Sequence, residues 1–84
     1  MMGTLFHYDE MLPATDREAV DAGGGQRQLE IFRPSGEEHI ELRLGLLGDQ
    51  HMGEGYAVRF DKASAREFLE GVERALGYFG WLPK

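Results

Sequence analysis

Three histidines and several glutamates are the residues of this 84-residue chain that could take part in chemistry. His39 and Glu41 are two positions apart, so they share one face of an extended strand, and His51 follows in the next loop. Imidazole nitrogens and carboxylate oxygens bind Zn²⁺, so a minor metal-dependent activity is one alternative function. Because the spacing matches no recognised zinc motif, we predict neither a metal site nor a cofactor.

The sequence also shows no combination of residues that is typical of a catalytic site. The chain has no cysteine, Ser35 falls in a predicted turn, and Ser64 has the position of a helix cap. Acid–base catalysis needs a carboxylate or histidine whose pKa is shifted in a cleft, whereas these glutamates fall at turns or on a polar sheet face. We therefore predict that the protein is not an enzyme.

Three arginines in predicted strands favour a second alternative, which is binding of single-stranded nucleic acid. Arg43 and Arg59 belong to the polar face of the predicted sheet, while the parity of Arg33 leaves its face open. The net charge of −6 opposes this function, because an acidic protein repels phosphate backbones. Glu41 and Glu54 also interrupt the arginines, so a nucleic-acid partner is the disfavoured alternative.

The order of the predicted elements is similar to that of the PC4-type transcriptional coactivators. The similarity covers Arg27 to about Leu76 and rests on element order and on the strand–helix junction from Gly55 to Leu69. It implies a strand meander followed by a helix, a dimer formed through that helix, and a basic sheet that grips single strands. This chain lacks the basic loops of that family, which weakens the implied nucleic-acid function.

Apolar residues outside the predicted core favour binding of a protein. A small domain without disulfides gains stability from self-association, and Trp and Tyr are over-represented at binding hot spots. We predict a small non-enzymatic binding or regulatory protein that acts through protein–protein contacts with an acidic surface, as a homodimer. The residues predicted to contact a partner are Tyr78, Trp81, Leu82, Leu47 and Met52.

The elements that position these residues follow from alternation and spacing. Apolar residues alternate over Gln28–Arg33, over Ile40–Leu46 and over Tyr56–Phe60, which predicts three antiparallel strands. Apolar residues at helical spacing from Ala65 to Tyr78, with Ser64 as the cap, predict one amphipathic helix. The expected class is α+β, a three- or four-stranded meander with one C-terminal helix packed on one face.

The first 25 residues differ in composition from the rest. Five acidic residues and one arginine give this segment a charge of −4. We predict an acidic N-terminal arm over residues 1–25, as an edge strand with a short helix or partly disordered, and a β-β-β-α domain over residues 26–84. No stretch has the length of a membrane span or the pattern of a signal peptide, so the expected location is cytoplasmic.

Overall fold

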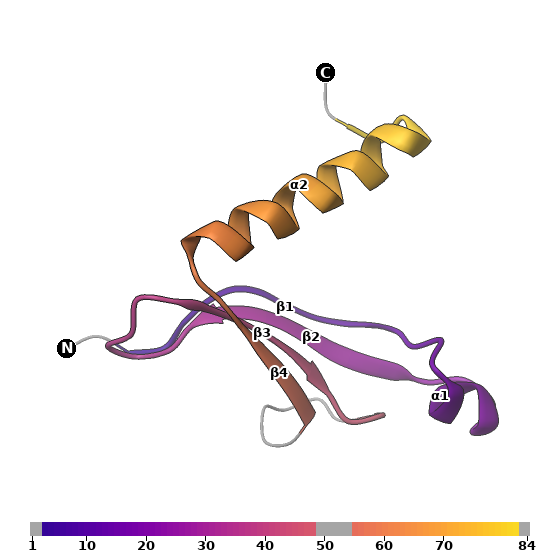
Figure 1. Cartoon of the computed structure of the whole chain (residues 1–84). Coiled ribbons are helices and arrows are strands. Elements are labelled where there is room, and N and C mark those ends of the chain that lie inside the picture. The colour runs from indigo at the N-terminus through magenta and orange to yellow at the C-terminus, as the bar shows by residue number, and fades with distance from the viewer. Residues whose placement is uncertain (1–2, 49–54, 83–84) are drawn as a thin grey trace.

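The computed structural model describes residues 3–48 and 55–82, and it forms one antiparallel sheet with two helices (Figure 1). The strands are β1 (Leu5–Pro13), β2 (Gln26–Arg33), β3 (Ile40–Gly45) and β4 (Gly55–Phe60), and they lie in that order across the sheet. Helix α1 (Arg17–Asp21) joins β1 to β2, and helix α2 (Lys62–Phe79) follows β4. The predicted α+β meander with a C-terminal helix is confirmed.

Strand β1 forms one edge of the sheet. It pairs with β2 along its length, from Leu5 opposite Arg33 to Pro13 opposite Gln26, with an irregularity between Phe6 and Tyr8. The connection through α1 closes where the Ala14 amide donates to the Gly25 carbonyl at 2.9 Å. The acidic segment of residues 1–25 therefore contributes both an edge strand and a short helix.

The register gives the sheet two chemically different faces. Residues that lie directly opposite one another across an antiparallel sheet point to the same face. The apolar sheet face carries Leu29, Ile31, Ile40, Leu42, Leu44, Tyr56, Val58 and Phe60. The polar sheet face carries Gln28, Glu30, Phe32, Glu41, Arg43 and Arg59.

Burial is concentrated on the polar sheet face along β2, which differs from the core expected from the leucine pattern. Glu30 is 1% exposed and Phe32 is 3% exposed. The Phe6 ring packs 5.3 Å from the Phe32 ring, and the Arg43 guanidinium lies 5.1 Å from it on another side. Long side chains from β1 and β3 thus cover the central strand on this face, whereas the apolar sheet face stays open.

Helix α2 does not pack across the sheet as predicted. None of its residues is buried, its main contact with the sheet is to β4, and it diverges from the strands along its length (Figure 1). It also begins three residues earlier than predicted, since Asp61 is the N-cap and Ser64 is the third helical residue of a capping box. A single residue, Asp61, separates β4 from α2, which is shorter than the roughly two to six residues that usually connect a strand to a helix.

Candidate functional site

The largest candidate site is an exposed apolar surface made of two parts. The first is the apolar sheet face, where Val58 is 52% exposed and Tyr56 is 76% exposed. The second is the helix stripe of α2, which consists of Ala65, Phe68, Leu69, Val72, Leu76 and Phe79. Leu69 in the middle of the stripe is 57% exposed. Large contiguous apolar surfaces of this kind mark interaction sites in soluble proteins.

The helix stripe and the apolar sheet face are joined at one corner. The rings of Phe60 and Phe68 stack with centroids 5.2 Å apart, which sets the direction in which α2 leaves β4. Beside this stack lies a hollow of about 520 Å³. It is lined by the apolar side chains of Ile40, Phe60 and Ala65 and by polar or charged ones that include Arg33, Asp61 and Lys62. The helix and the sheet therefore form the two sides of an open wedge.

The other end of the apolar sheet face also has a hollow. It measures about 330 Å³ and is lined by Leu12 of β1, Leu29 of β2 and Leu44 of β3, with Arg27 at its border. The apolar sheet face is thus recessed at both ends, a shape that suits an elongated apolar partner.

The predicted partner-binding residues fall in different parts of the molecule. Tyr78, Trp81 and Leu82 are all exposed at the end of α2, where Phe79 stacks on Trp81 with ring centroids 4.7 Å apart. Leu47 follows β3 and lies against Gly25, at the opposite end of the β3–β4 hairpin from the start of α2. Met52 lies outside the described residues. The structure brings the first three together but not Leu47.

The three arginines of the nucleic-acid alternative do not form one stripe. Arg43 and Arg59 lie on the polar sheet face, where Glu30 is directly opposite Arg43 and Glu41 is directly opposite Arg59. Arg33 has the parity of the apolar sheet face, and its Nε donates to the Glu37 carbonyl at 2.9 Å. Because these two glutamates lie opposite Arg43 and Arg59, the polar sheet face has a mixed charge rather than a basic one.

Two of the residues of the metal alternative, His39 and Glu41, lie next to each other in the structure. His39 Nε2 lies 3.1 Å from Glu41 Oε1, which is the expected result of their shared face. His51 lies outside the described residues. Among residues 3–48 and 55–82, no group of three histidine, aspartate or glutamate side chains is arranged to hold a metal ion.

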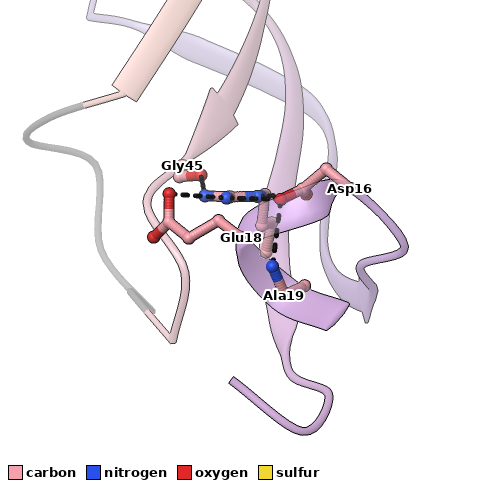
Figure 2. Close-up of polar contacts among 5 residues, drawn as sticks. Asp16, Glu18, Ala19 and Gly45 are labelled. Carbon is pink, nitrogen blue, oxygen red and sulfur yellow. Dashed lines mark hydrogen bonds and ion pairs between the residues drawn. The ribbon is translucent and has the colours of Figure 1, made fainter. Parts of the chain in front are cut away.

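A buried arginine makes the most extensive polar cluster, and sequence reasoning missed it. Figure 2 shows Asp16, Glu18 and Gly45 around one guanidinium, that of Arg27. The Arg27 Nε and one terminal nitrogen donate to the two Asp16 carboxylate oxygens at 2.8 and 3.0 Å. The other terminal nitrogen donates to the Gly45 carbonyl at 3.1 Å. The cluster links α1, β2 and the end of β3.

The same cluster caps α1. Asp16 Oδ1 accepts a hydrogen bond from the Ala19 amide at 3.2 Å, which satisfies a free donor at the helix start. The hydrogen bond from Arg27 holds the pKa of Asp16 well below its ordinary value, and Asp16 in turn raises the pKa of Arg27. Because each of the three guanidinium nitrogens has a protein oxygen as its partner, we interpret the cluster as structural.

Comparison with protein-family models, with curated proteins and with solved structures finds no match to this chain. No helix in the described ranges is long and apolar enough to cross a membrane. The geometry of the chain itself must therefore support any function. Sequence reasoning assigned the helix stripe and the apolar sheet face to the core, and the short β4–α2 junction is the signal that could have indicated otherwise.

Proposed function

We propose that this protein is a small, non-enzymatic binding protein that acts in the cytoplasm through protein–protein contacts and works as a homodimer. The observation that carries the proposal is the double apolar surface, the helix stripe together with the apolar sheet face. Exposing both surfaces to water is costly, at about 25 cal/mol per Å² of apolar area. Covering them by association removes that cost.

The size of the exposed surface supports a stable partner rather than a passing one. A compact 9.5 kDa chain should expose about 5,000 Å². This chain exposes 6568 Å², so the excess is about 1,500 Å². Two copies would together cover about 3,000 Å², which falls within the range of obligate homodimers.

Acidic residues give the proposed dimer a second surface. The acidic residues of segment 1–25, whose charge is −4, lie in strand β1, in helix α1 and at the N-cap of that helix. Charged residues on an edge strand discourage further strand pairing. An acidic edge of this kind favours a basic protein partner for the dimer.

Sedimentation equilibrium tests the proposal. We expect a mass of twice 9.5 kDa at micromolar concentration, and we expect Leu69→Glu to lower it toward the monomer. Val20→Glu is the matched control, because Val20 is an exposed apolar residue on α1, outside both apolar surfaces. A monomeric mass for the unmodified chain at high concentration would refute the homodimer. If Leu69→Glu does not fold, Leu69→Ala provides the milder version of the same test.

A further inference from the structure

We infer that the two copies exchange their C-terminal helices, so that the helix stripe of each α2 covers the apolar sheet face of the other copy. The inference rests on the proposed function, because it names the arrangement and the occupant of the same surface. The occupant is a second copy of this chain, and the reasons are geometric, energetic and electrostatic.

The geometric reason is that one chain carries both halves of a helix-on-sheet layer but leaves them apart. A sheet buries its apolar face against another layer, which here would be a helix. The Asp61 junction is held by the capping box, in which the Asp61 carboxylate accepts from the Ser64 amide at 2.9 Å and the Ser64 hydroxyl accepts from the Asp61 amide at 2.9 Å. With the Phe60–Phe68 stack beside it, this junction directs α2 away from its own sheet.

Dimensions agree with an exchanged helix. An 18-residue helix is about 27 Å long, and a six-residue strand such as β3 is about 20 Å long. A partner α2 can therefore reach across the apolar sheet face and into the hollows at both of its ends. The radius of gyration is 14.7 Å, whereas about 12 Å is expected for a compact chain of this length. A larger radius of gyration is expected for a chain whose helix extends from its own sheet in order to pack on the sheet of another copy.

The energetic reason concerns symmetry. In a twofold dimer each contact occurs twice, so a chain that offers both a helix stripe and a sheet face satisfies both surfaces with one partner. A different protein would have to supply a helix and a sheet in matching positions. Self-exchange needs no additional chain and covers both the helix stripe and the apolar sheet face.

The electrostatic reason is that the exchanged element is neutral although the chain is acidic. Helix α2 carries three basic and three acidic residues, namely Lys62, Arg66, Arg74, Glu67, Glu70 and Glu73. Bringing two copies of α2 into one interface therefore adds no net like-charge repulsion. Of the net charge of −6, −4 belongs to segment 1–25, whose His7 and Asp16 border the two hollows.

Disulfide trapping tests the exchange. Because the chain has no native cysteine, only the introduced cysteines can form disulfides. Val58→Cys chains are mixed with chains that carry a cysteine in the helix stripe, at Leu69, Val72 or Leu76, and are oxidised in air after refolding. Disulfides form only when the two Cα atoms come within about 7 Å. We expect at least one stripe position to give a mixed 58–stripe dimer in high yield. Arg74→Cys, on the opposite side of α2 by helical spacing, serves as the control and should give little.

Three results would separate the exchange from the proposed function. A dimer by sedimentation that forms only stripe-to-stripe disulfides overturns the exchange and leaves the homodimer intact. Disulfides between positions 58 and the stripe within a single doubly substituted chain at high dilution also overturn it, because they show that the helix closes on its own sheet. A monomer at every concentration overturns both the exchange and the homodimer.

Discussion

Truncating Val58 on the apolar sheet face should raise the dissociation constant of the dimer, and the size of the effect follows from the exposed fraction of this side chain. Val58→Ala removes two methyl-sized groups, whose full burial stabilises by about 0.8 kcal/mol each, or about 1.6 kcal/mol together. Val58 is 52% exposed in one chain, so about half of that, roughly 0.8 kcal/mol, is still to be gained on association. The dimer contains the site twice, which gives roughly 1.6 kcal/mol and a dissociation constant raised about 15-fold for Val58→Ala.

The assay is sedimentation equilibrium over a concentration series, with Val20→Ala as the matched control. Both substitutions remove the same atoms, and Val20 is even more exposed, at 63%, but lies on α1 outside the proposed interface. We expect Val20→Ala to leave the dissociation constant unchanged within about twofold. Equal effects of the two substitutions, or no effect of Val58→Ala, would refute the reasoning that places the apolar sheet face in the interface.

Three further predictions concern the fold and the polar sheet face. Because Arg27 lowers the folded-state pKa of Asp16, the contribution of this carboxylate to stability is fully present above its unfolded pKa of about 3.9 and is lost as the pH falls through the folded-state pKa. The urea midpoints of wild type and Asp16→Asn should therefore differ at pH 6, and the difference should shrink steadily as the pH falls from about 4 to about 2. Gly55→Ala should lower the free energy of unfolding, measured by urea denaturation, by about 3 kcal/mol. Gly55 has φ +133°, and an added Cβ would collide with the Leu44 carbonyl. Gly36→Ala is the control: Gly36 has φ +75° but lies in open space, so this substitution should lower the same free energy by only about 1 kcal/mol. Fluorescence anisotropy at low salt should detect no salt-dependent binding of a single-stranded oligonucleotide, since glutamates lie opposite both polar-face arginines; tight binding that is lost when Arg43 and Arg59 are replaced by alanine would instead favour the nucleic-acid alternative.

Much of the local structure could be predicted from the sequence. Apolar residues alternate strictly from Ile40 to Leu46, and strand β3 presents Ile40, Leu42 and Leu44 on one face, as the period of two requires. The apolar spacing of α2 likewise predicts its helix, with an error of three residues at the start. That error arose because Asp61 and Ser64 form a capping box one turn before the one predicted at Ser64.

Contacts between residues that are distant in the sequence were harder to predict, because no short sequence pattern connects such residues. Arg27 lies eleven residues from Asp16 and eighteen from Gly45, and only the folded sheet brings the three together. The face of Arg33 was left open for the same reason. Parity within one strand does not say which neighbouring strand lies beside it or in what register.

The sequence by itself determined that β2, β3 and β4 are strands, that α2 is a helix, and which face of each is apolar, because these are properties of local periodicity. Only the tertiary structure decided whether the two apolar faces meet within one chain. That outcome depends on the backbone direction at Asp61, which its capping box and the Phe60–Phe68 stack set together. The amphipathic helix that the sequence predicts as a cover for its own sheet therefore becomes, in three dimensions, the arm proposed to cover another copy.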